Sequence, residues 1–229
     1  MRPTKRLPAR ETWNRETIQE RLSTQYVGRH VHYFESIDST NRVARELGRQ
    51  GAAEGTLVIA DRQTAGRGRL NRQWLAPAGS SLLMSLLFRP DLPPPQSMRV
   101  TMTCSLAIAD AIEQTTPLHV RLKWPNDILV NGRKVGGILT ELSLNRERLD
   151  FVVVGIGLNV NLSFEESLAT YTPEAAPDTS RASLHHLSFS STSLSRELGR
   201  EISRLALLKA FLEGTERRYA ALKAGYLPL

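Results

Sequence analysis

With one cysteine and no long apolar run, this sequence of 229 residues excludes an intramolecular disulfide, a cysteine-based metal cluster and a membrane span. Its one cysteine, Cys104, cannot form an intramolecular disulfide and supplies no cluster of thiolate ligands. Cys104 stands in an apolar run with helical spacing, which predicts a core position rather than a nucleophile. No apolar stretch is long enough to cross a bilayer, and the basic residues 1–10 lack the apolar run of a secretory signal. We therefore expect a cytoplasmic protein without membrane contact.

Metal ligands are also scarce. His185 and His186 stand in a weakly patterned segment, without a cysteine or carboxylate at ligand spacing. We expect both histidines at the surface and assign no metal site.

Basic residues are in excess, with 30 Lys and Arg against 23 Asp and Glu and a formal net charge of +7. This charge suits a phosphorylated ligand, an acidic partner or nonspecific binding of nucleic acid. A helix-turn-helix pair is missing, and so is a pattern of basic and aromatic residues for base stacking. A basic nucleic-acid-binding domain is therefore an alternative that we do not favour. Steep salt dependence without ATP turnover would support it.

Apolar periodicity predicts one α+β domain over residues 1–229, with a mixed, largely antiparallel sheet flanked by helices. The turn at Asn131-Gly132 and a second at Asn145-Arg146 divide 120–161 into an antiparallel meander. Residues 163–193 are interpreted as a long connection with one helical turn near Leu184, and 1–13 as a loose arm. The other predicted strands are 30–34, 56–62 and 81–88, and the predicted helices are 16–26, 42–50, 97–115 and 194–223.

A basic, glycine-containing loop, Gln63 to Trp74, follows the predicted strand 56–62. Its glycines allow close approach of the backbone to a ligand, and its arginines present planar forks to phosphate or carboxylate oxygens. The glycines are Gly66 and Gly68, and the arginines are Arg67, Arg69 and Arg72. The pattern is typical of a mobile loop that closes over an anion, although a solvated basic turn has the same composition.

Five stretches of this sequence resemble the biotin protein ligase family, in the same order and at similar spacing, from about residue 33 to 161. They are Asp38-Ser39-Thr40-Asn41, Gly66-Arg67-Gly68-Arg69 with Trp74, Lys123-Trp124-Pro125-Asn126-Asp127-Ile128, Lys134-Val135-Gly136-Gly137-Ile138, and Gly155-Ile156-Gly157-Leu158-Asn159. Each stretch alone is weak evidence, whereas the ordered set is specific.

The resemblance implies a reaction in two steps. Biotin and ATP give biotinyl-5′-AMP and pyrophosphate, and biotin then passes to one lysine of a biotin carboxyl carrier protein domain. Mg²⁺ is expected with ATP, because magnesium prefers phosphate oxygens and few protein ligands. The implied fold is related to the cores of class II aminoacyl-tRNA synthetases and agrees with the predicted α+β class. The oligomeric state stays open, with a homodimer as one option.

The resemblance also implies roles for individual residues, and cations suit a reaction that concentrates negative charge at an α-phosphate. The implied catalytic residues are Lys134 and Arg69 for adenylation and Asp127 for acyl transfer. The implied biotin-binding residues are Ser39, Thr40, Gln63, Gly66, Arg67, Lys134, Gly137, Gly155 and Gly157. The implied ATP- and adenylate-binding residues are Arg67, Arg69, Arg72, Trp74, Lys123, Asn126 and Asn159. Taken alone, Lys134 would be a solvated hairpin lysine and Trp124 a core residue beside a corner.

Two departures from the family pattern stand out. Asn71 replaces a usual glycine, and Asn tolerates left-handed backbone better than most residues. The usual C-terminal small β domain and the N-terminal DNA-binding domain are not evident, which indicates the ligase-only type without specific DNA binding. The alternatives are a lipoate or octanoate ligase on the same fold, and a biotin-binding module without full turnover. Binding of biotin but not lipoate would separate them.

Overall fold

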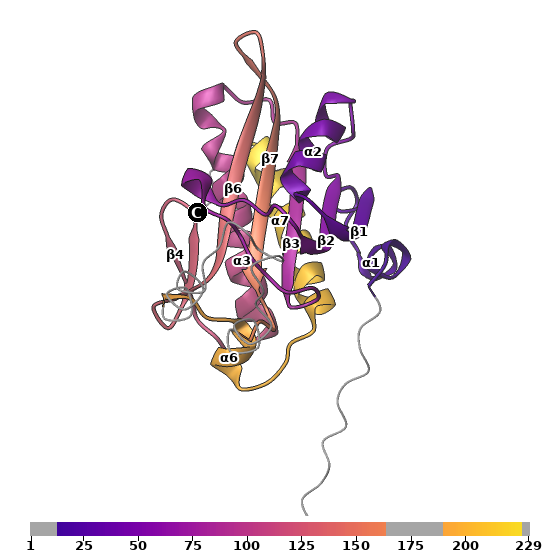
Figure 1. Ribbon diagram of the computed structural model, residues 1–229. Coiled ribbons are helices and arrows are strands. Elements are labelled where there is room, and N and C mark those ends of the chain that lie inside the picture. Colours follow the sequence, from indigo (N-terminus) through magenta and orange to yellow (C-terminus); the bar gives the residue numbers. More distant parts are fainter. Residues whose placement is uncertain (1–12, 164–189, 226–229) are drawn as a thin grey trace, which may run out of the picture.

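The computed structural model describes residues 13–163 and 190–225, which form a seven-stranded sheet with helices on both faces (Figure 1). The predicted arm 1–13, the helical turn near Leu184 and both histidines of that segment fall wholly or mainly outside the described residues. The strands are β1 (Val31–Ile37), β2 (Leu57–Gln63), β3 (Ser81–Phe88), β4 (Val120–Lys123), β5 (Asp127–Val130), β6 (Arg133–Asn145) and β7 (Arg148–Asn159). The α-helices are α1 (Arg15–Arg21), α2 (Thr40–Arg49), α3 (Met98–Thr115), α6 (Leu194–Leu198) and α7 (Arg204–Lys223), with 3₁₀ turns η1 (Arg69–Asn71) and η2 (Pro94–Gln96).

The sheet order is β1-β2-β3-β7-β6-β5-β4, which confirms the predicted mixed sheet. Only the β1–β2 pair is parallel among these strands, and every other neighbouring pair is antiparallel. Strands β4 to β7 form the predicted meander. The turn at Asn131-Gly132 has φ values of 51° and 75°, as a tight hairpin of this type requires.

Strand β7 shows how the sequence separates the two faces of the sheet, because successive side chains point to opposite sides. Val152, Val154, Ile156 and Leu158 belong to the large core shared with α3 and α7. Phe151 and Val153 pack on the other face, in a smaller cluster with Ala44 of α2. Further along that second face, β7 continues with glycine and asparagine instead of apolar residues. The strand therefore leaves an open area beside α2.

Helices α3 and α7 cover the first face, behind the sheet in Figure 1. Cys104 of α3 is fully buried in this core, as predicted, and burial raises the pKa of its thiol. Within the described residues, no helix combines the length and apolar character needed to cross a membrane.

Two predicted helices were wrong in extent. The predicted helix 194–223 is divided into α6 and α7, because Gly199 ends α6 in a left-handed conformation (φ 67°). Glycine takes this conformation without steric cost, so it terminates a helix whose apolar spacing continues beyond it. The predicted helix 16–26 ends at Arg21, where Leu22 turns to extended backbone.

Two local predictions were also wrong. The second hairpin turn lies at Arg146-Glu147, one residue later than predicted, because Asn145 still pairs with Arg148. Trp124 is 67% exposed in the connection between β4 and β5, not in the core. The adjacent Pro125 suggested a buried corner, but β4 is an edge strand and most of its residues are exposed.

Candidate active site

A cavity of about 460 Å³ lies on the α2 side of the sheet, between the start of α2, the loop 63–74 and strands β5 to β7. The cavity brings together nearly all of the residues that the sequence motifs indicated, although they span more than a hundred positions of the chain. Its lining includes Ser39, Thr40, Gln63, Arg67, Arg69, Arg72, Trp74, Lys123, Asn126, Asp127, Lys134, Gly137, Gly155, Gly157 and Asn159.

Glycines form the floor of the cavity because larger residues would collide with the side chains above them. A Cβ at Gly157 would lie 2.4 Å from Trp74 Cε2, and one at Gly137 would lie 3.3 Å from Trp74 Cζ3. A Cβ at Gly155 would lie only 1.9 Å from Asn41 Oδ1. Two of these glycines therefore make room for the Trp74 indole, and Gly155 makes room for Asn41.

The Trp74 indole itself carries a polar group without a partner. Its Nε1–H is buried and has no hydrogen-bond acceptor among the described residues. The Lys134 ammonium lies 5.8 Å from the centroid of the same indole. Because buried donors are rarely left unpaired, this N–H is available to a bound ligand or to a small movement of the indole.

Neutral hydrogen-bonding groups line one end of the cavity, at the start of α2. Gln63 Oε1 accepts hydrogen bonds from Thr40 N at 2.7 Å and from Thr40 Oγ1 at 3.1 Å. Ser85 Oγ donates to Thr40 Oγ1 at 2.8 Å. Ser39 is the N-cap residue, but its side chain makes no capping bond. This end therefore offers hydroxyl and amide groups that suit a polar, uncharged ligand.

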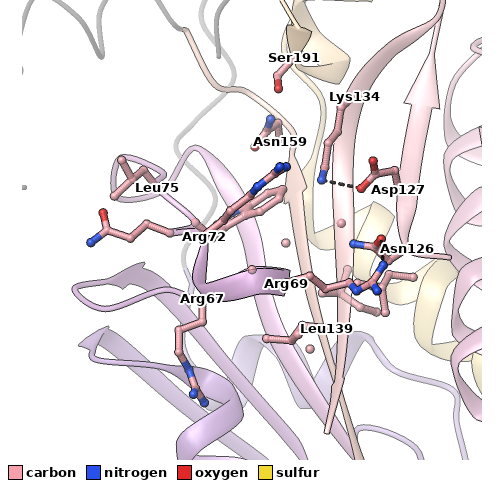
Figure 2. Close-up of a pocket in the computed structure, with 18 of the residues that line it drawn as sticks. Arg67, Arg69, Arg72, Leu75, Asn126, Asp127, Lys134, Leu139, Asn159 and Ser191 are labelled. Carbon is pink, nitrogen blue, oxygen red and sulfur yellow. Dashed lines mark hydrogen bonds and ion pairs between the residues drawn. The ribbon is translucent and has the colours of Figure 1, made fainter. Parts of the chain in front are cut away.

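Charged groups line the opposite end, where β5 and β6 begin. Lys134 Nζ lies 2.5 Å from Asp127 Oδ1, and Arg69 Nη1 donates to Asn126 Oδ1 at 3.1 Å (Figure 2). In the same view, Ser191 and Asn159 lie on the side of Lys134 that faces away from Asp127. The Lys134 side chain is 31% exposed and that of Asp127 is 26% exposed, so water reaches both groups. This end suits an anion.

The loop that carries the arginines is closed by its own backbone. Trp74 N donates to Gly66 O at 2.9 Å, and Gly68 N donates to Arg72 O at 2.6 Å. A Cβ at Gly66 would lie 2.4 Å from Trp74 O, so this closure needs glycine there. The left-handed residue of the loop is Leu70 (φ 56°), one position before Asn71, where sequence reasoning placed the tolerance for such backbone.

Arg67 does not join the other cations. Its side chain points away from Lys134 and Arg69 in Figure 2, and its Nη2 lies 3.3 Å from Glu141 Oε1. Glu141 also accepts from Asn41 Nδ2 at 2.8 Å and from Arg45 Nη1 at 3.0 Å. The structure therefore places Arg67 beside the neutral end of the cavity, in an ion pair.

Sequence reasoning missed several residues that shape the cavity. Asn41 belongs to the Asp38-Ser39-Thr40-Asn41 stretch but was given no role of its own, and its side chain links Ser85, Leu139 and Glu141. Ser191 lines the cavity although no local pattern marked it, because it reaches the site only through the pairing of its backbone with Lys134.

Residues 33–159 match the biotin/lipoate A/B protein ligase family. The chain is 39% identical over 198 residues to the bifunctional ligase/repressor BirA of Bacillus subtilis, a match that covers 86% of this chain and 56% of that protein. It is 39% identical over 145 residues to the biotin–[acetyl-CoA-carboxylase] ligase of Paracoccus denitrificans, covering 62% of this chain and 59% of the relative.

A solved structure agrees with these matches. The biotin protein ligase from Aquifex aeolicus, in complex with biotin and ATP, superposes with a TM-score of 0.65 at 29% identity, over 86% of this chain and 73% of that one. The chain spans about half the length of the curated relatives that it matches.

Proposed function

Because the chain belongs to the biotin/lipoate A/B protein ligase family, we propose that it is a biotin protein ligase. In the first step, a biotin carboxylate oxygen attacks the α-phosphorus of ATP, giving biotinyl-5′-AMP and releasing pyrophosphate. In the second step, a lysine amine of a carrier domain attacks the acyl carbon. An amide forms, AMP leaves and the amine loses a proton.

One observation carries this proposal: a single cavity has neutral hydrogen-bonding groups at one end and a lysine beside a carboxylate at the other. Biotin has the matching polarity, with an uncharged ureido ring at one end and a carboxylate at the other. Thr40 and Gln63, with Ser39 beside them, are then the groups that hold the ring. Lys134 is the group that meets the carboxylate.

Charge stabilisation is the main work of the first step. The attacking carboxylate and the phosphate are both anionic, so cations must already be in place where charge develops. Lys134 faces the cavity, and Arg69 is held toward it by Asn126. We assign Lys134 and Arg69 to the carboxylate and phosphate oxygens, and Arg72, Lys123, Asn126 and Asn159 to the nucleotide side.

Asp127 is suited to the second step. Its Oδ1 lies 2.5 Å from Lys134 Nζ in an ion pair, and 26% of its side chain is exposed to solvent. A carboxylate in this position orients an incoming lysine or accepts its proton. Arg67 contacts the ligand only after its ion pair with Glu141 breaks, and we assign this contact to the ligand-bound arrangement of the loop.

Mg²⁺ is expected to enter with ATP as part of the substrate. Among the described residues there is no group of three or more His, Cys, Asp and Glu side chains that would hold a metal ion. Magnesium usually takes most of its ligands from phosphate oxygens and water. The proposed acceptor is the biotin carboxyl carrier domain of a carboxylase, and the named relatives support this choice.

Labelling of an acceptor domain tests the whole proposal. The protein is incubated with ATP, Mg²⁺, biotin and a purified carrier domain, and lipoate replaces biotin in a parallel reaction. We expect the mass of one biotinyl group on one lysine of the carrier, and no product with lipoate. Labelling with lipoate alone would reassign the chain to the other branch of the family. If the protein bound biotin but labelled no carrier, it would be a biotin-binding module without full turnover.

A further inference from the structure

Glu197, a carboxylate that no sequence motif indicated, lies behind the charged end of the cavity. It belongs to α6, and only 5% of its side chain is exposed. It accepts hydrogen bonds from Asn131 Nδ2 at 2.8 Å, from Arg133 Nη2 at 2.5 Å and from Thr192 Oγ1 at 2.5 Å. A buried carboxylate with these donors is held firmly, because any other position would leave its charge unpaired.

The three donors come from two segments that meet at Lys134. Asn131 lies in the β5–β6 turn, and Arg133 is the first residue of β6 and the neighbour of Lys134. Thr192 comes from the segment that enters α6, and its N–H donates to Lys134 O at 2.8 Å. Glu197 therefore ties the segment before α6 to the strand that presents Lys134.

The Thr192 backbone links Lys134, assigned to the carboxylate and phosphate oxygens, with Asn159, assigned to the nucleotide side. Its N–H is bonded to Lys134 O, and its carbonyl accepts from Asn159 Nδ2 at 3.1 Å. Thr192 is completely buried, and the preceding residue, Ser191, lines the cavity. A shift of Thr192 would therefore move both Lys134 and Asn159, whereas the hydrogen bonds between Thr40 and Gln63 involve neither.

We propose that Glu197 is a positioning residue: it holds Ser191 and Thr192 against Lys134 and Asn159, and so fixes the charged end of the cavity, where the phosphates of ATP bind. The inference rests on the proposed function. Its consequence is a split between the two substrates, because loss of Glu197 disturbs the site for ATP and leaves the site for the ureido ring intact.

Kinetics of Glu197→Ala test this split. We expect kcat/KM for ATP in biotin-dependent pyrophosphate exchange to fall by about ten- to a hundredfold, since small misplacements of reacting groups carry losses of this order. We expect the Kd for biotin to rise by a much smaller factor, because Thr40 and Gln63 keep their hydrogen bonds and only the Lys134 contact with the carboxylate is disturbed. Glu197→Gln keeps an acceptor of the same shape and should recover part of the loss.

A double-substitution cycle tests whether Glu197 acts through Thr192. Thr192→Val removes the hydroxyl and keeps the shape, and we expect a smaller loss in the same direction. The combined variant should lose less than the two single losses predict together, because both remove one interaction. Glu201→Ala is the matched control: it removes an exposed carboxylate four residues away and should leave ATP and biotin kinetics unchanged.

Two results would overturn the inference: unchanged kcat/KM for ATP in Glu197→Ala, or an equal loss of biotin and ATP affinity together with a lowered Tm. Failure of the proposed function is distinguishable, because the parent protein would then show no exchange at all. In that case amide hydrogen exchange decides the inference. Faster exchange of the Thr192 amide in Glu197→Ala, with exchange in β2 unchanged, supports the positioning role of Glu197. Identical exchange at Thr192 in the two proteins refutes it.

Discussion

At the scale of single residues, the cavity depends on positions where a side chain is absent. Gly155 and Gly157 alternate with core residues of β7, so the strand can bury one face while its other face stays open. Gly155 faces Asn41, and Gly157 faces Trp74. These glycines are needed for space rather than for backbone freedom, whereas the family resemblance implied only that they bind biotin.

Substitution of Gly155 tests this steric reading. In Gly155→Ala the new Cβ would lie 1.9 Å from Asn41 Oδ1, so Asn41 must leave its bonds to Ser85 and Glu141. We expect a loss of about 1–3 kcal/mol in the free energy of unfolding, as for other overpacked sites, together with weaker biotin binding. Chemical denaturation and calorimetric titration measure the two effects.

Gly214 of α7 provides the control for that experiment. A Cβ at Gly214 would meet Ala107 Cβ at 3.6 Å, an ordinary contact, and alanine is the better helix former. Gly214→Ala should therefore leave stability unchanged or raise it slightly. Equal losses in both variants would show that Gly155 has no special steric role.

Lys134 should contribute to the rate of adenylate formation and not to the stability of the fold. Lys134→Ala should lower the rate of adenylate formation by about 10²–10³-fold, because it removes a positive charge from the place where negative charge develops. The free energy of unfolding should change by less than about 1 kcal/mol, since the ion pair with Asp127 is partly solvated. Stopped-flow or single-turnover measurement of biotinyl-AMP checks the rate.

Lys209 offers a matched comparison, because it is another partly exposed lysine in an ion pair, with Glu213 of α7. Lys209→Ala should adenylate biotin at the parent rate. If Lys134→Ala also kept the parent rate, its assignment to the reaction would be wrong.

Residues that act through nearby motif partners were predictable from sequence, and those that act across the fold were not. Lys134, Asn126 and Arg69 were indicated by their motifs, and the structure places them around one cavity. The ion pair between Arg67 and Glu141 joins positions 74 residues apart, and no local pattern reports such a contact. Trp124 was misplaced because apolar character alone does not distinguish an edge strand from a central one.

At the scale of elements, α6 and the segment before it carry the interactions that a continuous helix would not allow. Gly199 interrupts the predicted helix, and α6 can then turn Glu197 toward Arg133 and Thr192. Burial by itself raises the pKa of Glu197, but the hydrogen bonds from Thr192 and Asn131 and the charge of Arg133 outweigh it. The pKa of Glu197 is therefore held below its usual range.

The pH dependence of stability should report this carboxylate. A pKa that is lowered in the folded state contributes stability above the unfolded value, about 4.3 for glutamate, and this contribution is lost as the pH falls through the folded value. The difference in unfolding free energy between the parent and Glu197→Gln should thus be largest near neutral pH. It should shrink as the pH falls below about 4.3. A constant difference across this range would contradict the assignment.

The bounds of strands and helices were predicted with uneven accuracy, and the predicted strand 30–34 ends three residues before β1 (Val31–Ile37) does. The apolar run of β3 and the turn at Asn131-Gly132 gave the right bounds, because a continuous apolar run buried on both faces and left-handed turn residues leave strong local signals. Helix α1 was predicted too long because Leu22 and Tyr26 keep helical spacing while they pack as part of a bend. Apolar spacing shows which side chains are buried, but it does not show where the backbone leaves the helix.

At the scale of the whole molecule, one core holds the sheet against α3 and α7, and Cys104 is one of its fully buried members. Full burial raises the pKa of the thiol and blocks access to it. Cys104 should therefore react with a thiol reagent only when the protein unfolds, so that its labelling follows global unfolding in denaturant. Rapid labelling of the native protein, with no effect on activity, would show that this core opens locally.

The central claim is that this chain activates biotin in the cavity between α2 and the β5–β7 meander. Biotin-dependent exchange of labelled pyrophosphate into ATP tests it most directly, because the assay needs no acceptor protein and reports the first step alone. The account predicts exchange that requires both biotin and Mg²⁺, and that Lys134→Ala nearly abolishes. An absence of exchange in the parent protein at saturating biotin and ATP would contradict it.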